Sequence, residues 1–164
     1  LLQAWQHAHD AVRNASPVRS LQPEAASEIE ALASIILPSH DGPGAREAGV
    51  IHFIDRALGS FDQEQSGLYR EGLEAAQAAR RRLFPGSSTI ATLTEAQQIE
   101  LMKAIESTPF FEALRTHTIL GFLGNASYGG NRNGVGWAHI GFDDRMSFQP
   151  PFGYYDAEAA EPAK

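Results

Sequence analysis

The sequence predicts an all-α protein, an irregular helical bundle of about five helices with a long C-terminal extension rich in glycine and aromatic residues. Three observations support this prediction. Apolar residues recur at helical spacing in five runs before residue 124, strand-like alternation is scarce, and glycines and aromatics crowd the segment that follows. With 164 residues, of which 43% are hydrophobic, the chain suits one globular domain with a sizeable core.

The first two helices are predicted over residues 23–37 and 45–58. Pro23 stands at a favoured first-turn position and Pro38 ends the first run. Residues 39–44 form a turn cluster, and Gly59 ends the second helix. The apolar faces consist of Ile29, Leu32, Ala33 and Ile36 in the first helix and of Val50, Ile51, Ile54, Ala57 and Leu58 in the second.

Three further helices are predicted over residues 62–84, about 95–105 and 109–124. Asp62 is the expected cap of the first, Thr94 with Gln97 forms a capping-box pattern, and Thr108 precedes Pro109 at the last helix start. The expected inward positions are Leu68, Leu73, Ala76, Ala79 and Leu83, then Ile99, Met102 and Ile105, then Phe111, Leu114, Thr118 and Phe122.

The extension over residues 124–156 holds seven of the fifteen glycines and seven of the fifteen aromatic residues. Loops of this length inside a compact domain are uncommon unless they are functional or fixed to a surface. We therefore expect an irregular segment that wraps on its own bundle or on a partner. The predicted domain covers residues 1–156, with the helical body over 1–124, and residues 157–164 are expected to form a disordered tail.

Composition excludes several classes of function. The net charge of −7 makes the chain a poor nucleic-acid binder, because phosphates require a basic surface. Without cysteine, the chain cannot hold a disulfide, a cysteine nucleophile, a thiolate zinc site, an iron–sulfur cluster or covalent haem. No apolar run approaches the roughly 18 residues that span a bilayer. The chain starts at Leu1 without a methionine, and we expect a mature or trimmed product whose targeting segment is missing.

No self-contained active site is visible in the sequence. Gly134 and Gly136 begin a dinucleotide-like pattern, but His139 occupies the place of its third glycine. Asn125 stands where a nucleophile elbow around Ser127 requires glycine. The pattern therefore favours a binding subunit over an enzyme.

Other polar residues have ordinary structural interpretations. The best metal-like cluster is His7, His9 and Asp10, but a helix would point the two histidines roughly 200° apart. We expect exposed histidines there, and partly buried, hydrogen-bonded histidines at His52 and His117. The charged residues Asp41, Arg46, Glu47, Asp55 and Arg56 are interpreted as cap and ion-pair residues.

Two stretches carry a family resemblance. Residues 41–58 and 128–156 resemble the signature segments of the gluconate 2-dehydrogenase subunit 3 family, and the resemblance extends over about residues 24–156. The second stretch is specific: Tyr-Gly-Gly-Asn, Gly-Trp, Ile-Gly-Phe and Pro-Pro-Phe-Gly-Tyr-Tyr-Asp follow in that order.

The resemblance implies a non-catalytic small subunit of a flavin-dependent dehydrogenase complex that oxidises sugars, sugar acids or glycosides, glycoside 3-dehydrogenases included. In that family FAD belongs to a large subunit of the glucose-methanol-choline (GMC) type, and a multihaem cytochrome c often forms a third subunit. The small subunit carries a twin-arginine signal and escorts the folded flavoprotein to the periplasm. This chain has no twin-arginine signal, so periplasmic export follows only from the family. No cofactor, metal or catalytic residue is expected in the chain itself.

The aromatic extension is the predicted interface with the large subunit, because interface cores favour aromatic residues and arginine. The residues expected to contact the partner or to fix the contacting segment are Tyr128, Asn131, Arg132, Trp137, Phe142, Phe152, Tyr154 and Tyr155, with Arg132 and Arg145 as cross-subunit charge pairs. The alternative is that these aromatics cover the bundle's own core, above all Trp137. Two other functions stay open: a stand-alone enzyme with a His/carboxylate site, and a free periplasmic binding domain.

Overall fold

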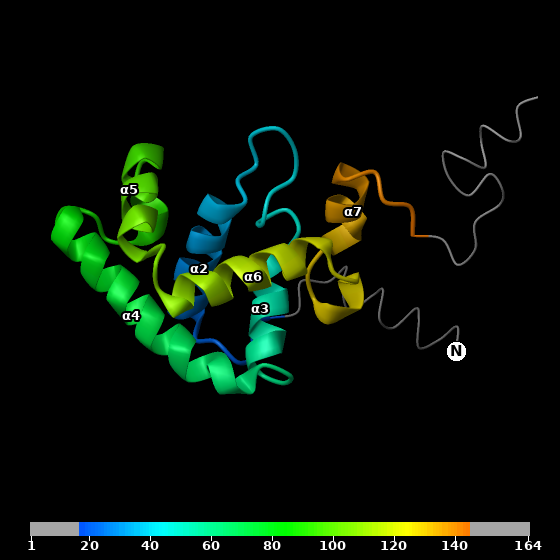
Figure 1. Ribbon diagram of the computed structural model, residues 1–164, viewed down its shortest axis with the longest axis horizontal. Helices are drawn as coiled ribbons and strands as arrows, with labels where there is room; N and C mark the ends of the chain where they lie inside the picture. The colour runs from blue at the N-terminus through cyan, green and yellow to red at the C-terminus, as the bar shows by residue number, and fades with distance from the viewer. Residues whose placement is uncertain (1–16, 145–164) are drawn as a thin grey trace, which may run out of the picture.

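The structure is a computed structural model, which describes residues 17–144 (Figure 1). Within this range the chain forms α-helices and short 3-10 turns, and no strand. The prediction of an all-α fold is confirmed. The helices are α2 (Pro23–Ile36), α3 (Val50–Leu58), α4 (Ser66–Leu83), α5 (Glu95–Ile105), α6 (Pro109–Leu123) and α7 (Val135–His139), and the turns are η1 (Gln63–Gln65), η2 (Ile90–Thr92), η3 (Ala126–Tyr128) and η4 (Arg132–Gly134).

Helix α6 is central to the bundle. It crosses α3, with which it makes the most extensive contact, and also contacts α2, α4 and α7 (Figure 1). Apolar side chains from four helices meet there without any solvent exposure, among them Leu32, Ile54, Leu101 and Leu114. The predicted apolar faces of α2 and α3 are thus the faces that form the core.

Two predicted helix starts are confirmed at the level of hydrogen bonds. The Thr94 hydroxyl accepts from the Gln97 N–H at 3.4 Å, and the Gln97 side chain accepts from the Thr94 N–H at 3.0 Å. At α6 the Thr108 hydroxyl accepts from the Phe111 N–H at 3.2 Å. Both motifs satisfy N–H groups that the helix itself leaves without partners.

Other predicted boundaries were wrong. Helix α3 begins at Val50 rather than at residue 45, because Gly49 adopts a left-handed conformation (φ 65°) that interrupts the turns before it. Helix α4 begins at Ser66, and Asp62 caps no helix with its side chain. That side chain is engaged elsewhere, in a contact with His117 on α6.

The inward faces of the later helices differ from prediction at two positions. Ile99 on α5 was expected in the core but is 47% exposed. On α6, Phe110 rather than Phe111 fills the core, where its ring meets the edge of Tyr69 at 5.4 Å. Helical spacing fixes which residues share a face, but the neighbours of that face decide which edge of it is covered.

The extension contains more helix than its glycine content indicated. Residues 124–144 hold η3, η4 and the short helix α7, in place of a wholly irregular segment. The remainder of the predicted extension, residues 145–156, and the expected tail over 157–164 lie outside the described residues.

A buried carboxylate fixes the path of the chain into α2. Asp55 on α3 accepts hydrogen bonds from the backbone N–H groups of Arg19, Ser20 and Leu21, at 2.9, 2.7 and 2.8 Å. The expectation of a capping role for Asp55 is met in an unforeseen form, because the capped backbone lies 34 to 36 residues away in sequence.

None of the helices in the described range is long and apolar enough to cross a membrane.

Candidate partner interface

The segment after α6 returns tightly over the end of that helix. The Asn125 side chain accepts from the Ser127 N–H at 2.9 Å and starts the turn. Gly130 and Gly136 then approach the backbone carbonyls of Gly121 and Phe122 so closely that a Cβ would collide with them. Glycine at these two positions allows the segment to lie directly on α6.

Asn131 fixes this return from within. It is fully buried, and its N–H donates to the Gly121 carbonyl at 2.7 Å. Its side-chain amide donates to the Gly124 carbonyl at 3.0 Å and accepts from the Gly136 N–H at 2.9 Å. The sequence predicted that Asn131 either contacts the partner or fixes the segment that does. In the structure Asn131 fixes the segment, and its side chain has no exposed surface.

Arg132 joins the segment to the start of α3. Its N–H donates to the Ala48 carbonyl at 2.9 Å, and its guanidinium lies beside Gly49. The same guanidinium acts on His52: burial lowers the pKa of His52 from its ordinary value of 6.5, and the positive charge of Arg132 lowers that pKa further. Arg132 is half-buried, so part of its side chain faces solvent.

Trp137 and Phe142 form one aromatic pair at the end of α7. The indole N–H of Trp137 donates to the Leu123 carbonyl at 2.6 Å, which attaches α7 to the last turn of α6. The Phe142 ring meets Trp137 at 5.2 Å between centroids and is 51% exposed. The half-buried Trp137 thus anchors a phenylalanine that faces solvent.

Tyr128 and Phe61 form a second exposed aromatic pair. Their ring centroids lie 6.3 Å apart at 85°, and the side chains are 52% and 51% exposed. Phe61 also contacts the buried Phe53 at 6.0 Å. The guanidinium of Arg56 on α3 donates to the Ser127 carbonyl and attaches the Tyr128 turn to α3.

Sequence reasoning missed Phe61. The available signal was a large apolar residue in the polar stretch Ser60–Gln65, with no helical partner of its own. Helix α6 exposes the further apolar side chains Ile119 and Leu120, and Ile140 is exposed directly after α7. We define the docking surface as Phe61, Ile119, Leu120, Tyr128, Ile140 and Phe142.

Four other predicted interface residues, Arg145, Phe152, Tyr154 and Tyr155, lie outside the described residues.

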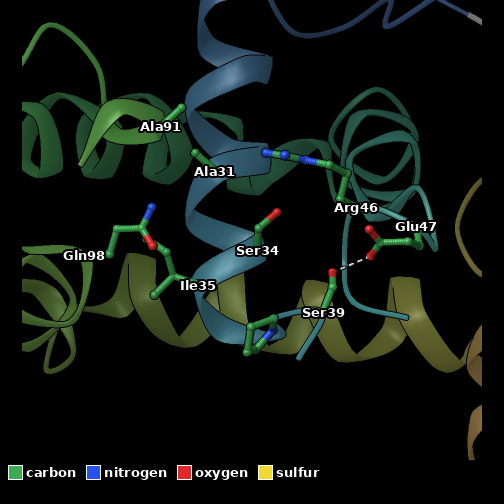
Figure 2. A pocket seen from close by; sticks show the side chains of 9 residues that line it. Ala31, Ser34, Ile35, Ser39, Arg46, Glu47, Ala91 and Gln98 are labelled. Atoms are coloured by element: carbon green, nitrogen blue, oxygen red, sulfur yellow. Dashed lines mark hydrogen bonds between the residues drawn. The ribbon is translucent and has the colours of Figure 1, made fainter. Parts of the chain in front are cut away.

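A separate cleft of about 240 Å³ lies along α2 (Figure 2). Ser34 and Ile35 line it, with Arg46 and Glu47 on one side and Gln98 on the other. Hydrogen bonds from the Ser39 hydroxyl (2.5 Å) and the Gly44 N–H (2.8 Å) lower the pKa of Glu47. Arg46 pairs with Glu30 at 3.9 Å, which confirms its predicted ion-pair role, whereas Glu47 accepts from the Gly44 N–H in a turn and caps no helix.

Potential metal ligands do not gather in the part of the chain that the structure describes: no group of three or more His, Asp or Glu side chains there could hold an ion. The cluster His7, His9 and Asp10 lies outside that part.

The comparisons with known proteins give one match. The model of the family described as gluconate 2-dehydrogenase subunit 3 matches residues 23–144, which is most of the chain and covers both aromatic pairs. The comparisons with curated proteins and with solved structures gave no match. The family description fits a small accessory subunit of a dehydrogenase complex with a catalytic partner. The chain therefore belongs to the gluconate 2-dehydrogenase subunit 3 family.

Proposed function

We propose that the chain is the non-catalytic small subunit of a periplasmic dehydrogenase that oxidises sugars, sugar acids or glycosides with FAD. Its partner is a large flavoprotein subunit of the GMC type, which holds the flavin, and a cytochrome c subunit can complete the complex. The chain acts as folding and export partner of the flavoprotein and stays bound to it. The observation that carries the proposal is the family match over residues 23–144.

The docking surface supports a role in assembly. Six large apolar side chains face solvent on α6, α7 and the two loops beside them. Three of the six, Phe61, Tyr128 and Phe142, are aromatic, and such rings bury a large area on binding for few immobilised torsions. A protein that works alone has no need to expose anchored aromatic pairs of this kind.

The docking surface is also held in place before any partner arrives. The Trp137 indole is hydrogen-bonded to α6, the Asn131 side-chain amide both donates and accepts a hydrogen bond, and Arg56 connects the Ser127 loop to α3. Pre-organisation reduces the entropy lost when a surface binds. A rigid aromatic surface is thus suited to a lasting complex.

The alternative of a stand-alone enzyme with a His/carboxylate site finds little support in the described residues. His117 contacts Asp62, but both its ring nitrogens are engaged and the imidazole is buried under Phe53 and Tyr69. A general base must reach the proton that it removes from a substrate. His117 reaches only the phenol and the carboxylate beside it.

Co-expression tests the proposal directly. The flavoprotein encoded with this chain is produced with and without it, and the soluble yield, the visible flavin spectrum and the periplasmic fraction are measured. The chain should co-purify with the flavoprotein and raise all three quantities. Equal yield and equal export without the chain would contradict the folding and export role, and failure to co-purify would contradict the subunit role as well.

The two remaining hypotheses predict different results in the same preparation. A stand-alone enzyme would oxidise or hydrolyse a sugar substrate as a purified single chain, and a free binding domain would bind without any flavoprotein attached. The purified chain should show neither turnover nor a flavin absorption band.

A further inference from the structure

A buried hydrogen-bonded row of three titratable side chains crosses the bundle from α4 to the turn before η1. The Tyr69 hydroxyl lies 2.8 Å from His117 Nδ1, and His117 Nε2 lies 2.9 Å from Asp62 Oδ2. Tyr69 and His117 are each only 2% exposed, whereas the Asp62 side chain is 27% exposed. One end of the row is therefore sheltered and the other end reaches water.

The partners fix the direction of the hydrogen bonds. A carboxylate only accepts, so Nε2 of the neutral imidazole carries the hydrogen and donates to Asp62. Nδ1 is then the acceptor, and the Tyr69 hydroxyl donates to it. His117 Nδ1 can accept a proton that leaves Tyr69. The imidazole can then pass its Nε2 proton to the carboxylate of Asp62, which reaches the surface.

The tyrosine ring is enclosed by aromatic groups. Tyr69 stacks on the His117 imidazole at 5.6 Å and meets the edge of Phe110 at 5.4 Å. Burial, with a smaller effect from the Asp62 charge, raises the pKa of the Tyr69 phenol well above its ordinary value of 10.0. A free phenolate is thus disfavoured, and loss of an electron from this ring must be coupled to loss of the proton to His117.

A small oxidant can approach Tyr69 from a groove in the surface. A largely apolar groove of about 390 Å³ lies between α2 and α4, and Tyr69 forms part of its wall together with Leu21, Ile29 and Leu73. The ring is covered from bulk water but lies directly under this groove. Asp62 does not line this groove, so the electron and the proton would leave Tyr69 by different routes.

We propose that Tyr69 is a redox-active tyrosine. A small oxygen-centred radical in the groove takes one electron from Tyr69 and one proton from water, and becomes the corresponding hydroperoxide or alcohol. The phenolic proton of Tyr69 moves to His117 Nδ1, the Nε2 proton moves to Asp62, and Asp62 releases a proton to water. The product is a neutral tyrosyl radical enclosed by Phe110 and His117. A one-electron reductant of the ascorbate or thiol class restores the phenol and becomes its own oxidised radical, while His117 Nδ1 returns its proton to Tyr69 and Asp62 passes a proton from water back to Nε2. This activity depends on the chain alone and is independent of the proposed role in assembly.

The test uses the full chain and a photogenerated ruthenium(III) polypyridyl complex as the one-electron oxidant, with electron paramagnetic resonance of samples frozen at increasing delays. The wild type should give a long-lived neutral tyrosyl signal. Tyr69→Phe, which removes only the hydroxyl, should abolish the long-lived component. Tyr128→Phe, at an exposed tyrosine, should leave that component unchanged.

The proton route has its own variant. Asp62→Asn retains the size of the side chain but removes the final acceptor, and it should lower the yield of the long-lived radical several-fold. Near-ultraviolet circular dichroism confirms that each variant is folded before oxidation. A long-lived signal that persists in Tyr69→Phe overturns the proposal, and an unchanged yield in Asp62→Asn overturns the proton route.

Discussion

The Glu28 carboxylate on α2 accepts a hydrogen bond from the Ile90 N–H at 2.8 Å, across 62 residues of sequence. Ile90 is the first residue of η2, and its N–H has no partner within that turn. Glu28 is buried, so it acts as a remote cap that attaches the α4–α5 connection to the first helix.

Removal of this cap should destabilise the whole bundle. We expect Glu28→Ala to lower the free energy of unfolding by about 2–3 kcal/mol, because the Ile90 N–H stays buried without an acceptor. Glu28→Gln retains an acceptor oxygen and should cost about half as much. Urea denaturation followed by circular dichroism measures both. Equal losses in the two variants would show that the side chain acts through its packing rather than through its oxygen.

Asn131 should be sensitive to substitution and its neighbour Asn133 should not. Both residues have positive φ, 44° and 57°, but Asn131 is buried with its side-chain amide hydrogen-bonded through both nitrogen and oxygen, whereas Asn133 is exposed. Asn131→Ala should lower the free energy of unfolding by about 2–4 kcal/mol through the lost hydrogen bonds and the left-handed backbone. Asn133→Ala has only the backbone cost, about 1 kcal/mol. Similar losses in thermal or urea unfolding of the two variants would contradict the anchoring role of the Asn131 amide.

Contacts between residues that are close in sequence could be predicted, and contacts between residues that are far apart in sequence could not. The caps at Thr94 and Thr108 were predictable because both partners lie within three residues. The roles of Glu28 and Asp55 were not, because their partners are 34 or more residues away and nothing local marks them. Asp62 has the residue type of a helix cap, but the contact with His117 takes its side chain instead.

The same reasoning applies to the docking surface. The composition of residues 124–156 predicted an aromatic segment fixed to a surface, and the positions of Tyr128, Trp137 and Phe142 agree with a segment fixed to α6. The position of Phe61 in a polar stretch marked it as unusual, but its place beside Tyr128 was not predictable because the two residues meet only through tertiary contact. Helix α7 was not predicted, because it begins directly after Asn133 and Gly134, whose left-handed backbone conformations are not typical of a helix start.

The docking surface can be tested at its aromatic pair. Phe61→Ser and Tyr128→Ser should each weaken binding to the flavoprotein at least tenfold, since truncation of a central aromatic in an interface costs about 2 kcal/mol or more. Ile99→Ser is the matched control, because Ile99 is similarly exposed but lies on α5, away from this pair. Surface plasmon resonance with the immobilised flavoprotein measures the affinities. If the control weakens binding as much as the aromatic variants do, the partner docks elsewhere.

The pKa of His52 makes stability dependent on pH in a defined direction. The folded state holds this pKa below the ordinary 6.5, so the unfolded chain binds the proton first as pH falls. Above about pH 6.5, protonation of His52 therefore does not change the free energy of unfolding. As pH falls from about 6.5 toward the pKa of His52 in the folded state, the protein loses stability. His52→Gln should remove this part of the pH dependence, measured by urea unfolding at a series of pH values.

The Arg132 charge should account for part of that pKa shift. Burial is the larger cause and remains after Arg132→Gln, so the pKa of His52 should rise toward 6.5 without reaching it. Arg115→Gln serves as the control, because Arg115 pairs with Glu112 on the exposed side of α6. The proton resonances of the His52 ring report the titration. An unchanged His52 pKa in Arg132→Gln would mean that the guanidinium is not held beside Gly49 in solution.

Two glycines of α4 should respond in opposite directions to alanine. A Cβ at Gly67 meets nothing within 4 Å, whereas a Cβ at Gly72 would collide with the ring of Phe110. Gly67→Ala should raise the free energy of unfolding by about 0.4–1 kcal/mol, since alanine restricts the unfolded chain and favours helix. Gly72→Ala gains the same helix preference but should be destabilising by about 1–3 kcal/mol overall, because Phe110 is enclosed in the core and cannot move aside. Chemical denaturation of both variants measures the change in the free energy of unfolding and its sign. Stabilisation by Gly72→Ala would mean that α4 and α6 pack less closely than the contact between Gly72 and Phe110 implies.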